Sequence, residues 1–316
     1  METARLTQGL QLLSLSQDNH IDTQIHAFII DRKAQRMSAG TLAFYRKKLG
    51  LFTRFVESQA ITYIDQLTAN DIREYLLWLE STGHNPGGVH CCYRALRTFL
   101  YWWEDEYEPE DWKNPIRKVK PPRIAVTPLE PADLVTVKAM LRTCTKTTIF
   151  AGARDRAALL FLLDTGCRAG EFTALDLPDY DTFSGAVTIR RGKGGKPRAV
   201  CVGRKTRKAL RAYFRKRGAD DSKALWVTDE HDRLHYGGLR SMVLRRAAAA
   251  GVHPPSLHSF RRFFALQCLR AGMDIFTLQK AMGHADLTVL RRYLAQTDDD
   301  VRLAHRQAAP VDRTEL

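Results

Sequence analysis

Six residues in the second half of the chain are of the types that bind and cleave a phosphodiester. Two lie in TGCRAGE and RRGKGGKPR, and four lie in residues 256–293, SLHSFRRFFALQCLRAGMDIFTLQKAMGHADLTVLRRY. Guanidiniums bind non-bridging oxygens, imidazoles add hydrogen bonds, an ammonium protonates a leaving alkoxide, and a phenol attacks phosphorus. These residues are Arg168, Lys193, His258, Arg261, His284 and Tyr293.

Other phosphate and metal chemistries lack their motifs. The stretch GKGGK at 192–196 does not have the G-x-x-x-x-G-K-[ST] frame of a Walker phosphate loop. No acidic triad stands out, which disfavours a metal-dependent integrase of the transposase kind. We therefore expect a reaction that uses neither a metal nor another cofactor.

The elements around the six residues follow from helix caps, glycines and alternation. An apolar helix breaks at Gly166, so Arg168 begins the next helix, and Glu171 lies on the same face, where it can fix the guanidinium. Alternating residues on both sides of a glycine-rich turn predict a β-hairpin with Lys193 at its tip. Lys196 is the competing candidate for the lysine. Thirteen Lys/Arg and no acid lie in residues 187–217, a basic patch that favours nucleic acid.

The remaining candidates lie on the last predicted helices. The Pro254-Pro255 pair forces a helix to begin at Ser256, which places His258 and Arg261 on one face. His284 follows Gly283 in a turn, and Tyr293 lies on a short helix after it. The sequence does not decide whether Arg262 also belongs to the site.

The first third of the chain predicts a small bundle of four amphipathic helices joined by short turns. Residues 1–20 are mostly polar and predict a loose arm. Residues 109–131 contain six prolines and little periodicity, which predicts a linker between a domain at 21–108 and a domain at 132–316. The first expected helix begins near residue 21, and the other three cover 41–58, 69–81 and 89–107.

Composition limits the setting. The chain has 316 residues, with 49 Lys+Arg against 35 Asp+Glu and a formal charge of +14. This excess favours a polyanionic partner. Six scattered cysteines without a C-x-x-C pair predict buried free thiols in a reducing cytoplasm. We find no signal peptide and no run near the ~20 apolar residues of a membrane span, so we expect no membrane association.

In their order and spacing, the six residues resemble those of the tyrosine recombinases, the family of phage integrases, Xer-type recombinases and Cre. The family pattern is Arg, Lys, His-x-x-Arg, His and Tyr, and the resemblance extends from about residue 20 to the end. Two positions depart from it. Gly170 replaces the usual serine before the glutamate, and Arg262 replaces a histidine that often follows the second arginine.

The resemblance implies a mainly α fold, in which a SAM-like core-binding bundle precedes a catalytic domain with a small β-sheet. It implies a metal-independent site-specific recombinase, or integrase, in which Tyr293 forms a 3′-phosphotyrosyl bond. Arg168 and Arg261 would bind the non-bridging oxygens, and Lys193 would protonate the departing 5′ oxygen. His258 and His284 would share proton transfer and phosphate binding, in a division that stays open.

The resemblance also implies double-stranded DNA with inverted-repeat half-sites as the partner, and a homotetramer in the synapse. Residues 298–316 would pack on a neighbouring subunit. About twenty residues are too few for an accessory arm-binding domain, which favours a Xer-like or small mobile-element recombinase.

Two alternatives remain. A type IB topoisomerase shares the chemistry but acts as a monomer, and the predicted bundle and the short distance from His284 to Tyr293 disfavour it. A basic DNA-binding protein without activity would carry the six residues by accident. Only the enzyme would form a covalent adduct with DNA that depends on Tyr293.

Overall fold

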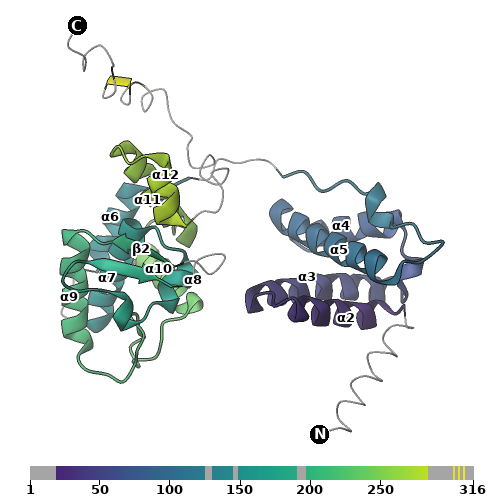
Figure 1. The fold of residues 1–316 in the computed structure, drawn as a ribbon, viewed down its shortest axis with the longest axis horizontal. Helices are drawn as coiled ribbons and strands as arrows, with labels where there is room; N and C mark the ends of the chain where they lie inside the picture. Colours follow the sequence, from purple (N-terminus) through teal and green to yellow (C-terminus); the bar gives the residue numbers. More distant parts are fainter. Residues whose placement is uncertain are drawn as a thin grey trace. The chain divides into compact units, whose positions relative to one another are not determined.

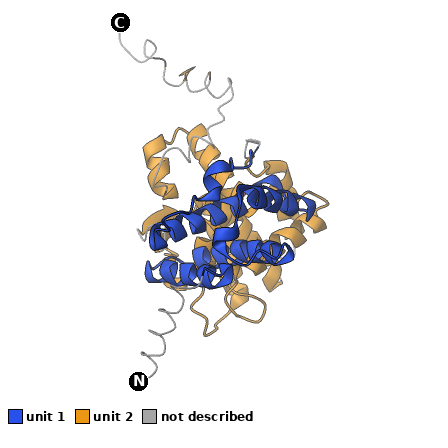
Figure 2. Ribbon diagram, turned by 90° about the vertical axis from the view of Figure 1, so that its right-hand side faces the viewer, with its two compact units in different colours: residues 1–126 blue, residues 127–316 orange. Residues whose placement is uncertain are grey.

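The computed structural model describes residues 19–124, 130–144, 149–190 and 197–283, together with positions 302, 305, 306 and 309. The chain divides into two compact units, residues 1–126 and 127–316 (Figure 2). Each unit has its own hydrophobic core. The mainly helical fold with one small antiparallel sheet is the predicted class.

The N-terminal unit is the predicted helical bundle (Figure 1). Ser38 and Thr68 accept hydrogen bonds from backbone amides of the helices that follow them, as expected of N-caps. The fourth helix begins at Pro86, three residues before the predicted start, because Asn85 caps it and proline suits the first helical position. The four helices are α2 (Ile21–Ala34), α3 (Ala39–Ser58), α4 (Ala69–Ser81) and α5 (Pro86–Tyr107).

The predicted linker at 109–131 is wrong in its first part, which belongs to the bundle. Residues Pro115–Lys118 form a 3-10 turn, η2, and Ile116 and Val119 are buried in the core of the N-terminal unit. The Tyr93 hydroxyl donates to the carbonyl of Val119 over 2.8 Å. Ile116 and Val119 lie three residues apart, so both side chains point into the core and bury this segment despite its prolines.

The C-terminal unit surrounds α7 (Phe150–Thr165), which packs against α9 (Arg204–Arg217) and α11 (Leu257–Arg270) (Figure 1). The predicted hairpin is present as β1 (Ala186–Ile189) and β2 (Arg198–Cys201), which pair antiparallel. Its turn, residues 191–196, lies outside the described residues. The other elements are α6 (Leu134–Thr143), α8 (Ala169–Ala174), η3 (Leu177–Asp179), α10 (Tyr236–Ala249) and α12 (Ile275–Met282), and in the N-terminal unit η1 (Ile64–Gln66).

Gly166 determines the path from α7 to α8. It ends α7 in the left-handed region, with φ +55°, where a glycine is free of the strain that a side chain causes. A Cβ here would lie 2.4 Å from Cδ1 of Phe264 on α11. The glycine therefore allows α11 to lie directly against the turn that leads to Arg168.

Two further expectations concern thiols and membranes. All six cysteines are free, but only Cys92, Cys144 and Cys167 are buried, and Cys201 is exposed on the hairpin. Among the residues that the structure describes, no helix is long and apolar enough to cross a membrane.

Candidate active site

The structure describes three of the six predicted site residues, Arg168, His258 and Arg261. The other three predicted residues, Lys193, His284 and Tyr293, lie outside the described residues. The described part of the site therefore consists of the two arginines, the first histidine and the groups that hold them.

Arg168 is the N-cap residue of α8, as its position after Gly166 predicts. Its backbone amide donates to Oε2 of Glu171 over 2.8 Å, and its Nη1 donates to Oε1 of the same carboxylate over 2.8 Å. This confirms that Glu171 fixes the guanidinium. The Arg168 side chain keeps 30% of its surface exposed, so it is held in place and still open to a ligand.

Glu171 is shared by a second arginine. Arg198 on β2 donates from Nη1 to Oε1 over 3.0 Å and from Nη2 to Oε2 over 2.6 Å. Burial by itself raises the pKa of Glu171, but the hydrogen bonds from Arg198 and Arg168 outweigh it and bring the pKa to about 2. The carboxylate is therefore ionised at any physiological pH and carries its charge between two guanidiniums.

Arg261 is buried on α11, with 1% of its surface exposed. Its Nη1 donates to the carbonyl of Gly166 over 2.7 Å, and its Nη2 donates to the carbonyl of Met282 over 2.5 Å. Carbonyl oxygens thus stabilise a charge that would otherwise be costly to bury. A phosphate can reach this guanidinium only after neighbouring groups move.

The C-terminal end of α12 brings three arginines together. Arg198 Nε donates to the carbonyl of Ala281 over 2.8 Å, Arg261 to that of Met282, and Arg168 Nη2 to that of Gly283 over 3.4 Å. The last carbonyls of a helix have no partners within the helix and carry partial negative charge, so cations are favoured there. Three consecutive carbonyls, directly before His284, therefore gather guanidiniums from β2, α11 and the α7–α8 turn.

His258 lies on the first turn of α11, close to Arg168 and Arg261. Partial burial of its ring, followed by the positive charges of Arg262, Arg261 and Arg168, lowers its pKa below the ordinary 6.5. The imidazole is therefore neutral at neutral pH, the state in which one ring nitrogen donates a hydrogen bond and the other accepts one.

Arg262, which the sequence left open, donates from Nη1 to the carbonyl of Glu130 over 3.0 Å. It ties α11 to the segment that enters the C-terminal unit, and its charge acts on His258. Arg198 is the residue that sequence reasoning missed, because it was counted only as part of the basic stretch. The position of Arg198 in the strand could have revealed it. Arg198 lies two residues before the buried Val200, and residues two apart in a strand face the same side, here the inward one.

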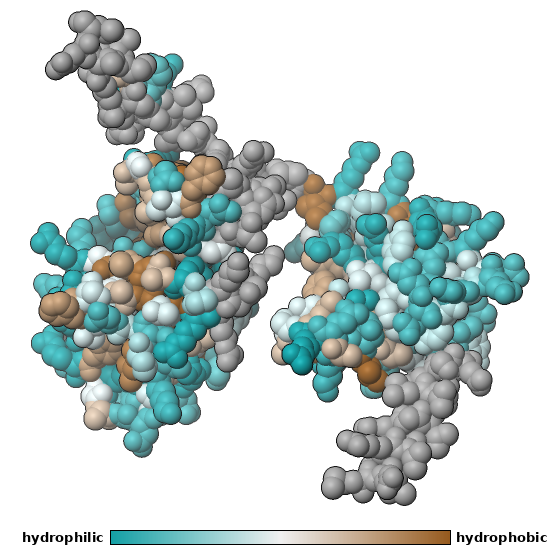
Figure 3. Space-filling view, in the orientation of Figure 1, coloured by the Kyte–Doolittle hydropathy of each residue, from teal (hydrophilic) through white to brown (hydrophobic). Residues whose placement is uncertain are grey.

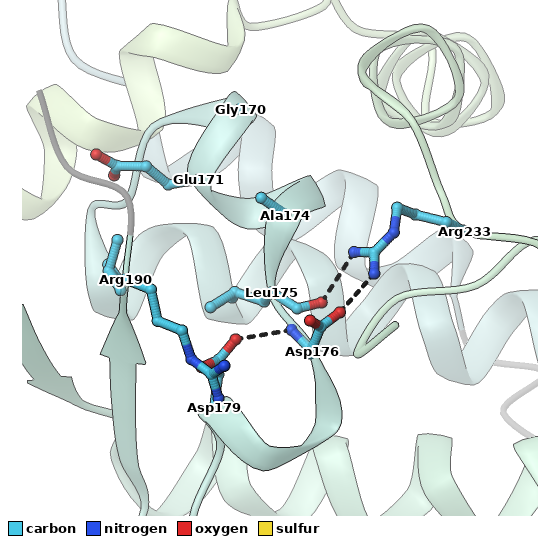
Figure 4. A pocket seen from close by; sticks show the side chains of 9 residues that line it. Gly170, Glu171, Ala174, Leu175, Asp176, Asp179, Arg190 and Arg233 are labelled. Carbon is cyan, nitrogen blue, oxygen red and sulfur yellow. Dashed lines mark hydrogen bonds and ion pairs between the residues drawn. The ribbon is translucent and has the colours of Figure 1, made fainter. Parts of the chain in front are cut away.

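A polar pocket of about 490 Å³ lies beside Glu171, between α8, η3 and the end of β1 (Figure 4). Arg190 forms an ion pair with Asp179 and Arg233 with Asp176. Its charges are thus already paired, and neither Arg168 nor Arg261 lines it. We assign it to the support of the site. Within the described ranges, no group of three His, Cys, Asp or Glu residues is placed to hold a metal.

Replacing Glu171 with Gln should lower the free energy of unfolding near neutral pH by about 3 kcal/mol, because it removes a buried charge that pairs with the nearly buried Arg198 and the partly exposed Arg168. The folded pKa of about 2 lies below the ordinary 4.5. The stabilisation by the carboxylate is therefore complete above the ordinary value and is lost as the pH falls from there through about 2.

Urea unfolding of both proteins, near neutral pH and at about pH 3, measures this difference. Glu57→Gln, at an exposed position of α3, is the control and should behave like the parent chain at both values. A gap between Glu171→Gln and the parent that is equally large in acid would contradict the pairing described here.

Comparison with known proteins identifies the family of the chain. The sequence profile of the phage integrase family matches residues 134–300, and that of the phage integrase N-terminal SAM-like domain matches residues 27–106. The chain is 28% identical over 302 residues to tyrosine recombinase XerC of Oceanobacillus iheyensis. This match covers 92% of this chain and 96% of the relative. It is 30% identical over 282 residues to XerC of Chromobacterium violaceum, covering 87% and 90%.

Among solved structures, the fold is similar to that of a lambda integrase tetramer bound to a Holliday junction. The TM-score is 0.69, at 14% identity, over 85% of this chain and 78% of the other. The profiles together match both units, and the relatives extend over nearly the whole chain. The chain therefore belongs to the phage integrase family, the tyrosine recombinases, which are site-specific DNA strand-exchange enzymes.

Proposed function

We propose that this recombinase cleaves and rejoins duplex DNA through a covalent phosphotyrosine at Tyr293. The observation that carries the assignment is the meeting of Arg168 and Arg261 at the end of α12, with His258 close enough to feel both charges. The sequence continues from that end into His284, and Tyr293 follows nine residues later. The cationic cluster thus adjoins, along the chain, the segment that contains the phenol.

Arg168 and Arg261 bind the two non-bridging oxygens of the scissile phosphate in this proposal and stabilise the charge of the transition state. Arg168 is held by Glu171 and is open to solvent, so it meets the phosphate first. Arg261 donates to two backbone carbonyls and is buried. Binding of DNA then includes a rearrangement at the end of α12 that exposes Arg261, because its hydrogen bonds to the carbonyls must give way to bonds with the phosphate.

Tyr293 attacks phosphorus, and the 5′ oxygen leaves with a proton. The phenol has an ordinary pKa near ~10, and the nearby guanidiniums favour its ionised form during attack. Lys193 is the proposed donor to the leaving oxygen, with Lys196 as the alternative. His258 is neutral at neutral pH and can pass a proton or hold a phosphate oxygen, and His284 shares this work.

The partner is double-stranded DNA with inverted-repeat half-sites, in the cytoplasm. Exposed basic residues on α3 and α5 support contacts to phosphates, and the face of the N-terminal unit seen in Figure 3 is largely hydrophilic. Because two duplexes require four cleavages and each subunit has one nucleophile, the active assembly is a tetramer, the state of the lambda integrase on its Holliday junction. The basic residues are Arg46, Lys47, Arg54, Arg94 and Arg97.

Residues 298–316 are the proposed connector between subunits, and an apolar groove of the C-terminal unit is its proposed acceptor. The groove has a volume of about 560 Å³ and lies between α7, α9 and α11. Leu163 and Phe263 line it, and Arg204 and Lys205 lie at its edge. The tail begins with three aspartates and then contains small apolar residues, so its charge and its apolar positions match this groove.

Tyr293→Phe should bind DNA like the parent chain but form no covalent adduct, because it lacks the attacking oxygen. A nicked suicide substrate, analysed by denaturing electrophoresis, measures the adduct. The parent chain should form it undiminished in EDTA. Adduct formation by Tyr293→Phe, or a requirement for Mg²⁺, would contradict this mechanism.

Lys193→Ala should slow cleavage by a factor of about 10²–10⁴ and change binding little, because a general acid acts in the transition state. A substrate with a 5′-thiol leaving group needs little protonation and should largely rescue this variant. Lys196→Ala is the matched control, from the same turn. Rescue of the Lys196 variant alone would transfer the role to Lys196.

Deletion of residues 299–316 should leave binding to a single half-site nearly intact and remove cooperative synapsis and recombination. Lys205→Glu, at the edge of the groove, should weaken synapsis in the same way. Gel shifts on one and two half-sites beside a recombination assay measure both effects. Full recombination by the truncated chain would show that the tail is not a connector.

A further inference from the structure

We propose that Arg198 is a positioning residue for strand cleavage, which holds Arg168, its own strand β2 and the end of α12 in one arrangement. The inference rests on the proposed roles of Arg168, Lys193 and Tyr293. It concerns a residue outside the six that the sequence singled out, and it follows from the contacts of one side chain.

The first contact of Arg198 is Glu171. Oε1 accepts from Nη1 of Arg198 and Nη1 of Arg168, and Oε2 accepts from Nη2 of Arg198 and the backbone amide of Arg168. Each carboxylate oxygen therefore joins the two arginines. Loss of the Arg198 fork would remove the hydrogen bonds that hold the Glu171 carboxylate from the side of β2, so Glu171 and the Arg168 side chain bonded to it could shift together.

The second contact is the end of α12, where Arg198 Nε donates to the carbonyl of Ala281 over 2.8 Å. The fit is close, because a Cβ on Gly283 would lie 3.1 Å from Cδ of Arg198. Gly283 ends α12 with φ +62°, and His284 follows it. Arg198 therefore fixes the place from which the chain leaves toward His284 and Tyr293.

The third relation is to the hairpin turn. Arg198 pairs with Ile189 across the hairpin, and this pair is the last one before the turn that contains Lys193 and Lys196. Because its side chain is anchored to α8 and α12, the strand is fixed at the point where the turn ends. One side chain thus joins α8, which begins at Arg168, to the end of α12 and to the strand that follows residues 191–196 in the sequence.

Burial makes this role one of positioning. Only 7% of the Arg198 side chain and 5% of that of Glu171 are exposed, so Arg198 has little surface with which to meet DNA. Five N–H donors in a planar fork make the three hydrogen bonds to Glu171 and Ala281 possible, and the single ammonium of lysine cannot reproduce that geometry. Arg198→Lys retains the charge and removes the fork, which separates geometry from charge.

Arg246 on α10 provides a matched control. It donates from Nε to Asp155 over 2.8 Å and from Nη1 to the carbonyl of Thr143, at the end of α6, over 3.0 Å. Like Arg198, it joins a buried carboxylate to the end of a helix, but it contacts none of the proposed site residues. Arg246→Lys should therefore lower thermal stability without slowing cleavage at temperatures at which the protein is folded.

The experiment measures single-turnover cleavage of a suicide substrate, half-site binding and thermal unfolding for the full-length variants. Arg198→Lys should slow cleavage about 100-fold, the cost of a misplacement of about 1 Å, and change binding less than about threefold. Addition of Glu171→Gln to Arg198→Lys should slow cleavage little further, because both changes release the same guanidinium. A neutral methylphosphonate at the scissile position should shrink the defect of Arg198→Lys and that of Arg168→Lys alike.

Three outcomes would overturn the proposal. The first is cleavage by Arg198→Lys at the parent rate, and the second is slower cleavage by Arg246→Lys in proportion to its loss of stability. The third is a double variant in which the effects of Arg198→Lys and Glu171→Gln on the cleavage rate are fully additive. Absence of an adduct in the parent chain would instead contradict the proposed function, so the two failures are distinguishable.

Discussion

The carboxylate of Glu171 is the interaction on which the rest of the site depends. It is a negative charge that pairs with two guanidiniums directly, those of Arg168 and Arg198. Without it, Arg168 and Arg198 would repel each other at close range, and Arg198 is too buried for water to screen its charge fully. The bonds that hold the pKa of Glu171 at about 2 therefore also set where Arg168 lies.

The end of α12 supplies the second half of this arrangement. Carbonyls that no residue within the helix can satisfy accept from Arg198, Arg261 and Arg168 in consecutive order. The helix end is stabilised by the same side chains that the reaction is proposed to use. Binding of a phosphate must therefore compete with the helix for Arg261, which links occupation of the site to the chain that begins at His284.

The fold brings these groups together from distant positions in the sequence. The turn after α7 needs a glycine at 166, because Phe264 of α11 occupies the space of a Cβ. That close approach places Arg261 within reach of the carbonyl of Gly166, two residues before Arg168. The N-terminal unit forms its own core and takes in Ile116 and Val119, so the polar connection between the units is shorter than the prolines suggested.

The sequence by itself determined the fold class, the extent of the helix at 69–81, the helix start at Ser256, the hairpin, and the pairing of Arg168 with Glu171. These features depend on neighbours within a few residues, which periodicity and capping reveal.

Only the tertiary structure decided that Arg198 is part of the support, that Arg261 is buried, and that three arginines meet the end of one helix. These facts depend on contacts between residues 21 to 115 positions apart. A basic residue in a basic stretch looks the same in the sequence whether it is exposed to solvent or paired with a buried carboxylate, and only packing separates the two.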